Sequence, residues 1–299
     1  MNSITCTLPG GYVDKNGKVH RNAELAPLSG HEEELLAGSR NAPMTLVTSI
    51  LSRCVNCIGS INPVTEEVAR NLLVADRQYL LLKLREATFG EQVRANIFCP
   101  WPDCGKKIDI DFLIKDIPVR ESTEKGPAYN MELSPEAALT EENGNEYRKI
   151  IFRLPNGGDQ ESISSLLSEN EALALSMLLK CCILSIGPVK NPGSELISYL
   201  SPLARMEIEK RMIEVSPMVD MTMGVICPEC NREFAVPFDL QDFFFGELRT
   251  SKDLLYREIH YLAYHYHWSE REILEMPREK RRKYIEVLAD EIERLNNVA

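Results

Sequence analysis

The sequence contains no apolar stretch long enough to cross a membrane. A membrane-spanning helix needs about 20 consecutive, mostly apolar residues, but the most apolar stretch, Ala172 to Ile186, is interrupted by Ser176, Lys180 and Ser185. That stretch predicts a buried helix. The first 18 residues have neither a basic start nor a continuous apolar run, so we expect no secretory signal peptide. We therefore expect a cytoplasmic protein without a membrane partner.

The sequence also lacks the short motifs that mark common catalytic sites. It has no glycine-rich phosphate loop, no Gly-x-Ser-x-Gly nucleophile turn and no His-Glu-x-x-His motif. Its paired acidic residues fall in polar stretches that we expect to be exposed. We therefore predict that the protein is not an enzyme.

Positive charge is scarce as well. The chain has 34 basic and 45 acidic residues and a net charge of −11, whereas a protein that binds phosphates needs a basic face. The acidic excess lies in the first 248 residues, because the part from Arg249 onward has ten basic and ten acidic residues. We expect the partners to be proteins rather than nucleic acids.

The 299 residues, of which 44% are hydrophobic, suffice for one large domain or two ordinary ones. Helical spacing of apolar residues dominates, and strand-like alternation is confined to short segments. These patterns predict a helix-dominated α+β fold with an N-terminal β-hairpin, two half-zinc-ribbon hairpins joined at one four-cysteine zinc site, and C-terminal helices. We expect an N-terminal hairpin (1–30), helices with a first zinc knuckle (31–114), an exposed connection (115–146), helices with a second knuckle (147–248) and a C-terminal helical region (249–299).

Individual elements follow from the same patterns. The N-terminal hairpin turns at Asn16-Gly17, where positive φ is accepted easily. Strands are predicted over 93–97, 108–112, 129–133, 147–154, 219–225 and 234–238. Helices are predicted over 31–37, 43–55, 63–73, 76–87, 161–167, 169–186, 202–215, 251–266 and 269–276, and from 277 onward.

Nine cysteines without a secretory signal indicate a reducing compartment, where close cysteine pairs more often bind metal than form disulfides. Two pairs, Cys99 with Cys104 and Cys227 with Cys230, each begin with Cys-Pro and lie between alternating strand segments. They form a weak internal repeat, separated by 128 residues. Two hairpin turns that each present a cysteine pair are the zinc-ribbon arrangement. We predict one structural Zn²⁺ held by these four residues; the alternative is two unrelated reduced pairs.

The remaining cysteines are interpreted as structural. Cys54 and Cys57 lie at the end of a helical pattern, whereas a redox pair lies at a helix N-terminus, where the helix dipole lowers the thiol pKa. We expect both to be small buried residues. Cys181 and Cys182 lie inside the most apolar helix and are expected in the core.

Two further groups near the C-terminus are candidates that we interpret as structural. His260, His265 and His267 are spaced five and two residues apart, whereas ligands on one helical face are spaced three or four apart. The basic run from Arg278 to Lys283 has acidic residues one helical turn away, which favours the solvated face of a helix over a phosphate site.

Residues 254–269 carry five aromatic residues and three histidines, more apolar area than a terminal helix needs. The apolar stripe of the last predicted helix can cover only one side of this segment; it consists of Tyr284, Leu288, Ile292 and Leu295. Aromatic side chains are common anchors at protein interfaces, so we predict a partner-binding surface, with Ile259 and Leu262 in the core. The alternative is that the whole segment is core. The candidate partner-binding residues are Tyr261, Tyr264, His265 and Trp268.

Four stretches of the sequence together resemble a known family. They are Gly11-Tyr12-Val13-Asp14 with Gly17-Lys18-Val19-His20-Arg21, the Leu-x-Gly-x-Glu-Glu-Glu of Leu28 to Glu34, Asp76 to Arg85 with Thr88-Phe89-Gly90, and Glu258 to Ala263 through His267 to Glu270 and on to Arg281-Arg282-Lys283-Tyr284. They resemble the baseplate hub assembly proteins, or chaperones, of T-even-type contractile phage tails. The chain is more similar to the longer relatives encoded with phage-tail-like contractile injection systems.

The resemblance implies a non-enzymatic assembly factor or minor baseplate component, made in the cytoplasm, with hub, spike or wedge proteins as partners. The short phage members do not share the Cys-Pro knuckles, so the resemblance leaves open whether this chain is a transient chaperone or a permanent part. The competing hypothesis is a zinc-ribbon nucleic-acid-binding regulator. The predicted hairpins disfavour it because they carry Asp109, Asp111, Glu229, Glu233 and Asp239.

Overall fold

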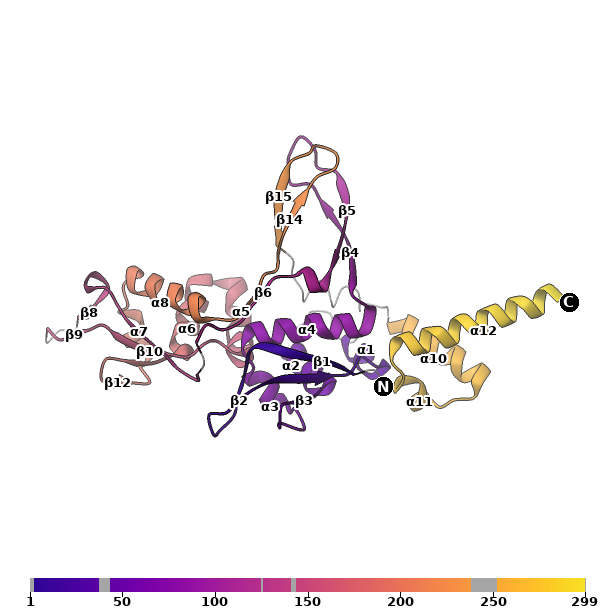
Figure 1. The fold of residues 1–299 in the computed structure, drawn as a ribbon, viewed down its shortest axis with the longest axis horizontal. Coiled ribbons are helices and arrows are strands. Elements are labelled where there is room, and N and C mark those ends of the chain that lie inside the picture. Colours follow the sequence, from indigo (N-terminus) through magenta and orange to yellow (C-terminus); the bar gives the residue numbers. More distant parts are fainter. Residues whose placement is uncertain (1–2, 38–43, 125, 141–143, 238–251, 299) are drawn as a thin grey trace.

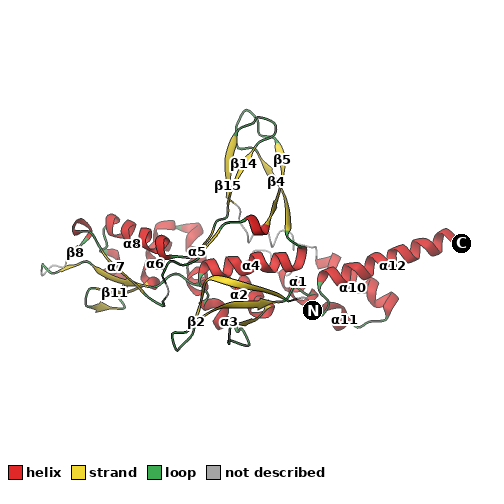
Figure 2. Cartoon of the chain, viewed as in Figure 1, coloured by secondary structure: helices red, strands yellow, loops and turns green. Residues whose placement is uncertain are grey.

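The computed structural model describes residues 3–37, 44–124, 126–140, 144–237 and 252–298. Within them the chain has a mixed α/β fold, dominated by helix, with an N-terminal β-hairpin and C-terminal helices, as predicted. Figure 1 shows four parts: a central body, a lateral lobe on one side, C-terminal helices on the other, and an arm of two hairpins that projects from the body. Figure 2 shows that strands form the arm and helices the C-terminal part.

The central body consists of a three-stranded sheet, in the order β1-β2-β3, and four helices. Its elements are β1 (Ile4–Val13), β2 (Val19–Leu25), α1 (Gly30–Ala37), α2 (Met44–Cys54), β3 (Val55–Ile58), α3 (Glu66–Asn71) and α4 (Val74–Phe89). The predicted hairpin of β1 and β2 is confirmed, and β2 also pairs with β3, which was not predicted. The fully buried members of its core include Leu8, Leu25, Leu28, Ile50, Leu51, Ile58 and Leu80.

Asp76 anchors α4 to the sheet. Its buried carboxylate accepts hydrogen bonds from the N–H groups of Gly10, at 2.8 Å, and Gly11, at 2.9 Å. These two glycines lie where the pairing of β1 with β2 is irregular, which leaves their N–H groups free to donate outside the sheet. Burial raises the pKa of the Asp76 carboxyl to about 6, although both N–H groups act to lower it. The contact fixes α4, and α4 leads directly into the arm.

The lateral lobe has its own core and a four-stranded sheet in the order β12-β11-β10-β7. Its elements are β7 (Tyr129–Glu132), the 3₁₀ turn η2 (Pro135–Ala137), β8 (Leu139–Thr140), β9 (Glu146–Tyr147), β10 (Lys149–Phe152), α5 (Gly157–Glu169), α6 (Glu171–Cys182), β11 (Ile183–Ile186), β12 (Val189–Lys190), α7 (Ser194–Ser198) and α8 (Pro202–Val215). The helix predicted over 169–186 is wrong in its last part, because the helix ends at Cys182 and the next four residues pair with β10. Cys182 is buried in this core, as predicted.

The stretch 115–146 is more structured than its polar composition indicates. The predicted strand near Tyr129 is present as β7 and pairs with β10. Ile117 packs in the core of the central body, whereas Leu133, Ala137 and Leu139 pack in the core of the lateral lobe. The described residues of the stretch therefore contribute to both cores.

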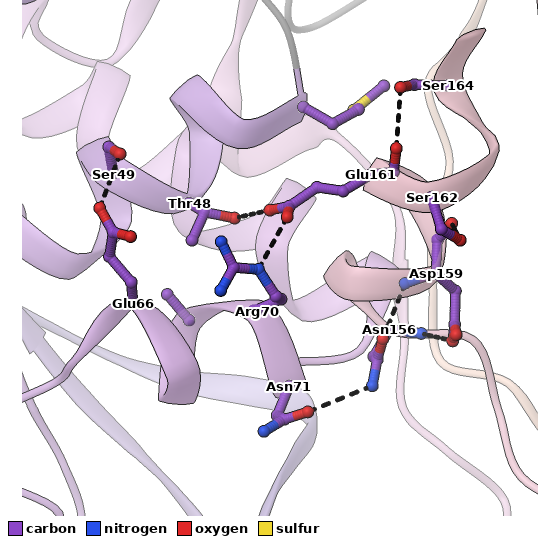
Figure 3. Close-up of polar contacts among 12 residues, drawn as sticks. Thr48, Ser49, Glu66, Arg70, Asn71, Asn156, Asp159, Glu161, Ser162 and Ser164 are labelled. Atoms are coloured by element: carbon purple, nitrogen blue, oxygen red, sulfur yellow. Dashed lines mark hydrogen bonds and ion pairs between the residues drawn. The ribbon is translucent and has the colours of Figure 1, made fainter.

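A polar network joins the lateral lobe to the central body (Figure 3). Glu161 of α5 accepts hydrogen bonds from the hydroxyl of Thr48 in α2 and from Nε of Arg70 in α3, the latter at 2.7 Å. Thr48 in turn accepts from Nη1 of the buried Arg77, at 2.8 Å. Gly157 packs so closely on this guanidinium that a β-carbon would lie 2.0 Å from Nη1, so a side chain at residue 157 would force Arg77 to move.

The arm consists of two antiparallel hairpins, each a separate two-stranded sheet. Its elements are β4 (Gln92–Phe98), β5 (Lys107–Leu113), β14 (Thr222–Ile226) and β15 (Glu233–Pro237), with the 3₁₀ turn η1 (Ile114–Asp116) and the paired strands β6 (Val119–Arg120) and β13 (Met218–Val219) near its base. The predicted strands of the arm are confirmed within one residue at their described ends, except that the strand predicted from residue 219 begins at Thr222, because Val219 pairs with β6 instead. The predicted end of the last strand at Phe238, and Asp239 after it, lie outside the described residues.

The C-terminal part contains α10 (Lys252–Tyr266), α11 (Glu270–Leu274) and α12 (Arg278–Val298). Ser269 and Glu272 form a capping box at the start of α11. A small core includes Leu255, Ile273 and Leu274, together with Ile259 and Leu262, which were predicted to be core residues. No helix in the described ranges is both long enough and apolar enough to span a membrane.

The interpretation of the basic run as a solvated face is wrong for two of its residues. Arg281 is fully buried, and its Nη2 donates to both carboxylate oxygens of Glu33 in α1 at 2.9 Å, while its Nε donates to Glu258 at 2.8 Å. Arg278 is also buried and donates to Glu33 at 3.2 Å. These ion pairs attach α12 to the central body. The run looks solvated in the sequence because its buried partner is more than 240 residues away.

Candidate metal centre

Both hairpins of the arm end in tight turns of the same design. In the first, the N–H of Cys99 donates to the carbonyl of Lys106, and the N–H of Cys104 donates to the carbonyl of Trp101, each at 2.9 Å. In the second, the N–H of Cys227 donates to the carbonyl of Arg232 at 3.0 Å. These bonds hold the two cysteines of each turn close together.

The residue after the second cysteine has a left-handed conformation in each turn. Gly105 has φ +56 and Asn231 has φ 56. Glycine and asparagine are the residues that adopt this conformation most readily. The chain can therefore reverse directly after Cys104 and Cys230, and both cysteines of each turn face the same point.

The two turns meet at the tip of the arm and bring four thiols together. The Sγ atoms of Cys99, Cys104, Cys227 and Cys230 all lie within 4.8 Å of one another. Cys99 Sγ is 3.8 Å from Cys230 Sγ, and Cys104 Sγ is 3.8 Å from Cys227 Sγ. A disulfide would require about 2.05 Å, so all four cysteines are free thiols.

This spacing fits a four-coordinate metal ion. Tetrahedral zinc–thiolate bonds of about 2.3 Å place neighbouring sulfurs about 3.8 Å apart. Soft thiolate donors select zinc, copper(I) or iron among biological metals. Cys99 and Cys227 are buried and pack with Ile108, while Cys104 and Cys230 are half-buried. The cluster could therefore hold one metal ion in a closed site.

The protons on these thiols are held unequally. Burial raises the pKa of the Cys99 thiol to about 12. Burial acts to raise the pKa of the Cys227 thiol as well. However, the backbone N–H groups of Cys230 and Glu229 donate toward its sulfur, and the pKa is lowered to about 7. A bound cation favours the thiolate form of every ligand, so metal binding here would release protons.

Two reciprocal ion pairs surround the thiols. Asp103 of the first turn pairs with Arg232 of the second, and Glu229 of the second pairs with Lys106 of the first, the latter at 2.7 Å. The Arg232 guanidinium also lies 4.9 Å from the centre of the Trp101 ring. Each turn thus contributes an acid directly before its second cysteine and a base two residues after it. The sequence contains this signal as Asp-Cys-Gly-Lys and Glu-Cys-Asn-Arg, but the ion pairs themselves were not predicted.

Two family models together match nearly the whole chain. The model of the family described as T4 bacteriophage base plate protein matches residues 1–245. The chain belongs to this family. A second model, described as a family of unknown function (DUF6760), matches residues 248–299. No curated protein and no solved structure matched the chain.

In this baseplate-family chain, the four stretches that carry the resemblance are joined by buried contacts. Gly11, of the first stretch, donates to Asp76, of the third. Glu33, of the second stretch, accepts from Arg281, of the fourth. The first contact holds α4 on the sheet of the central body, and the second attaches α12 to that body.

The candidate partner-binding residues lie on α10 of the baseplate-family chain and directly after it, and they differ in exposure. Tyr264 is 69% exposed, and its ring meets the exposed His265 at 5.0 Å. Tyr261 is half-buried, with its ring 4.9 Å from that of His265. Trp268 instead stacks on Tyr266 at 4.7 Å, within the packing of α10 on α12. Tyr264 and His265 are therefore the accessible members of the set.

The other cysteine and histidine groups lie away from this centre. Cys54 is the last residue of α2 and is buried, as predicted, and this burial raises the pKa of its thiol. Cys57 lies in β3 and is half-buried. His260 and His265 are exposed, and their rings pair with tyrosines rather than with each other. Within the part of the chain that the structure describes, the four arm cysteines are the one group of side chains placed to share a metal ion.

Proposed function

We propose that this chain is a non-enzymatic assembly factor or minor structural component of a contractile, phage-tail-like baseplate. The observation that carries the proposal is the match of the baseplate family over residues 1–245, which includes the central body, the lateral lobe and both hairpins of the arm. Its partners are then hub, spike or wedge proteins, and it is made in the cytoplasm. The contacts among the four family-like stretches support a structural role, because one holds α4 on the sheet of the central body and the other attaches α12 to that body.

In this proposal the four cysteines hold one structural Zn²⁺. A site closed by four protein ligands leaves no open position for substrate, unlike a catalytic zinc site. Isolated two-stranded hairpins are at best marginally stable in water, and the arm consists of two of them, which meet at the cysteines. The metal would hold the hairpins together at the tip, and so connect residues 123 positions apart in the chain.

The proposed contact with another baseplate protein is through Tyr261, Tyr264, His265 and Trp268. Tyr264 and His265 are exposed and pack on each other rather than into a core. Rigid aromatic side chains of this kind supply contact area at low entropic cost. Trp268 contributes by holding the end of α10 against α12.

The electrostatics of the arm do not support a nucleic-acid-binding ribbon. Residues 92–113 and 222–237 contain four basic and five acidic residues, a net charge of −1. Two of the basic residues, Lys106 and Arg232, are paired with acids across the tip. A surface that binds phosphates needs several unpaired cations on one face.

Mass spectrometry of purified, assembled particles tests the proposal. A structural component is present in the particle at a fixed ratio, whereas an assembly factor is absent from the particle but required for its formation. Deleting the gene and counting particles by electron microscopy separates the second case from no role at all. Normal particles that lack the chain and form without it would refute the proposal.

A further inference from the structure

Strand β14 of the arm has an open edge. Within the described residues it pairs only with β15, and the N–H of Cys227, the residue after β14, donates to the carbonyl of Arg232 at 3.0 Å. Hydrogen-bonded and non-bonded residue pairs alternate along an antiparallel ladder, so every second residue of β14 points its N–H and C=O groups away from β15. These residues are Thr222, Gly224 and Ile226. The backbone groups of Gly224 and Ile226 have no hydrogen-bond partner among the described residues.

A cleft of about 490 Å³ runs along this edge, between β14 and β5. It is lined by residues 110–112 of β5, by residues 116–118 and 220 at the base of the arm, and by all five residues of β14. Consecutive residues of a strand point to opposite faces, so a cleft lined by all five follows the edge of β14 rather than one of its faces. Figure 1 shows β14 and β5 on the two hairpins of the arm, which projects from the central body.

The two edges of this hairpin differ in how they resist further pairing. Edge strands are commonly protected by charged side chains, prolines or bulges. The outer edge of β15 carries Glu233 and Pro237, and proline has no N–H to donate. β14 contains no charged residue and no proline, and it pairs with β15 without a bulge. The edge that faces the cleft is therefore the one that can accept another strand.

Gly224, at the centre of β14, is not required by the packing of the chain itself. A β-carbon at this position would lie 3.7 Å from the Glu233 carboxylate, which is an ordinary van der Waals contact. The residue is also not among the glycines with positive φ. A glycine inside a strand often marks the close approach of another backbone, and the backbone of Gly224 points into the cleft.

The side chains around the cleft are apolar or acidic. The apolar lining residues include Ile110, Met223, Val225 and Ile226. Ile226, at the end of β14 nearest the tip, is 65% exposed. The cleft can therefore cover apolar side chains of a strand that lies in it.

The charged lining residues of the cleft are Asp111, Asp116 and Asp220. Asp111 forms an exposed ion pair with Arg94 at 3.6 Å, and Asp220 accepts a hydrogen bond from the N–H of Thr222 at 3.0 Å. Within the described part of the chain, neither Asp116 nor Asp220 has a basic side chain as an ion-pair partner. Because oppositely charged side chains on neighbouring strands stabilise their pairing, these carboxylates favour lysine or arginine in an added strand.

We propose that an extended segment of a partner protein, in which apolar and basic residues alternate, lies in this cleft as an added strand on β14. Main-chain hydrogen bonds to Gly224 and Ile226 hold the segment, and its side chains meet the apolar walls and the three carboxylates. A second copy of this chain is the poorer occupant, because it would bring a further net charge of −11 to an acidic cleft. The partner need not be a hub, spike or wedge protein.

Binding of the purified full chain to three labelled seven-residue peptides, measured by fluorescence anisotropy, tests this proposal. In the first, valine alternates with lysine; in the second, valine alternates with glutamate. The third is the lysine peptide with every backbone nitrogen methylated, so it keeps the charge but has no N–H donors. We expect the lysine peptide to bind at least about tenfold more tightly than either control at low salt. No binding of the lysine peptide, or equal binding of its methylated form, would overturn the proposal.

Two matched variants assign the binding to one edge of the hairpin. Gly224→Pro removes an N–H from the edge that faces the cleft, whereas Ala235→Pro, directly opposite on β15, removes one from the other edge. Both leave the hydrogen bonds between β14 and β15 in place. We expect Gly224→Pro to weaken binding of the lysine peptide at least about tenfold and Ala235→Pro to leave it within about twofold. Equal effects in folded variants would refute the edge.

A third variant decides the question if thermal unfolding shows that Gly224→Pro does not fold. Asp116→Asn combined with Asp220→Asn should reduce the preference for the lysine peptide over the glutamate peptide at least about threefold; an unchanged preference would overturn the proposal. Sedimentation of the chain alone must show a monomer, since a dimer that the lysine peptide dissociates would assign the cleft to a second copy instead. None of these readouts depends on particle assembly, so the baseplate proposal can fail or hold separately.

Discussion

Arg281 of α12 donates two hydrogen bonds of 2.9 Å to the carboxylate of Glu33 in α1, and both side chains are buried. Glu33 lies in the region matched by the baseplate family, whereas Arg281 lies in the region matched by the family of unknown function. The pair therefore joins two separately recognised segments into one structure. Breaking a buried ion pair by removing one partner leaves a charge without its counterion in a poorly solvated place.

We therefore expect Arg281→Met to lower the free energy of unfolding by about 3 kcal/mol. The matched control is Arg282→Met, which changes the exposed neighbour on the same helix and should cost less than about 0.5 kcal/mol. Urea denaturation of the three proteins measures both values. Equal stabilities for the two variants would show that the buried pair does not attach α12.

Asp76 gives the fold a pH dependence of known sign. Its pKa is about 6 in the folded protein and 3.8 for an ordinary carboxyl, because burial disfavours the charged form. The folded protein therefore binds this proton more tightly than the unfolded chain does. The contribution of the protonated Asp76 to the free energy of unfolding is therefore complete below pH 3.8, and it is lost as the pH rises through about 6.

Comparison with Asp76→Asn isolates this contribution, because asparagine does not titrate. A shift of about two pKa units corresponds to about 3 kcal/mol. The free energy of unfolding of the wild type, minus that of Asp76→Asn, should fall by about this amount between about pH 3.5 and pH 7. Loss of metal at low pH affects both proteins, so its effect cancels in the difference between their free energies of unfolding. A difference that does not change with pH would contradict the burial of a carboxylate at this position.

The surface of α10 should be needed for assembly but not for folding. Tyr264→Ala with His265→Ala removes exposed rings, so we expect no particles and a nearly unchanged Tm, measured by electron microscopy and by thermal unfolding. Trp268→Ala is the contrasting variant: its ring packs on Tyr266 and Tyr284, and its loss should cost about 1–3 kcal/mol of stability. If the double variant assembles normal particles or unfolds, the docking surface has been assigned wrongly.

Nucleic-acid binding should be weak and insensitive to sequence. The chain has a net charge of −11, so we expect dissociation constants above about 1 μM at physiological salt in a gel-shift assay with unrelated DNA and RNA fragments. Tight binding that depends on sequence would favour the zinc-ribbon regulator over a baseplate role.

The tip of the arm illustrates what could be predicted from the sequence. Alternating strands beside Cys99 and Cys227 are a local signal, and they correctly placed both turns. The ion pair of Asp103 with Arg232 was not predicted, because it links residues 129 positions apart and becomes visible only when the two turns meet. Arg281 was misinterpreted for the same reason, since its burial depends on Glu33 in a distant helix.

Two short strands were missed for a different reason. β3 begins at Val55 directly after Cys54, and β11 begins at Ile183 directly after Cys182, in each case with no glycine or proline to end the helix. A four-residue apolar strand cannot be distinguished from one more turn of a buried helix by periodicity alone. Pairing with β2 and with β10 determines the strand conformation, and that pairing depends on tertiary structure.

Metal analysis of the purified chain tests the central claim most directly. Inductively coupled plasma mass spectrometry should find about one zinc per chain in the wild type. Cys227→Ser should lose it, whereas Cys54→Ser, which changes a buried cysteine of the central body, should retain it. A wild-type chain without metal or with iron in place of zinc, or a zinc content that depends on Cys54 and not on Cys227, would contradict the account.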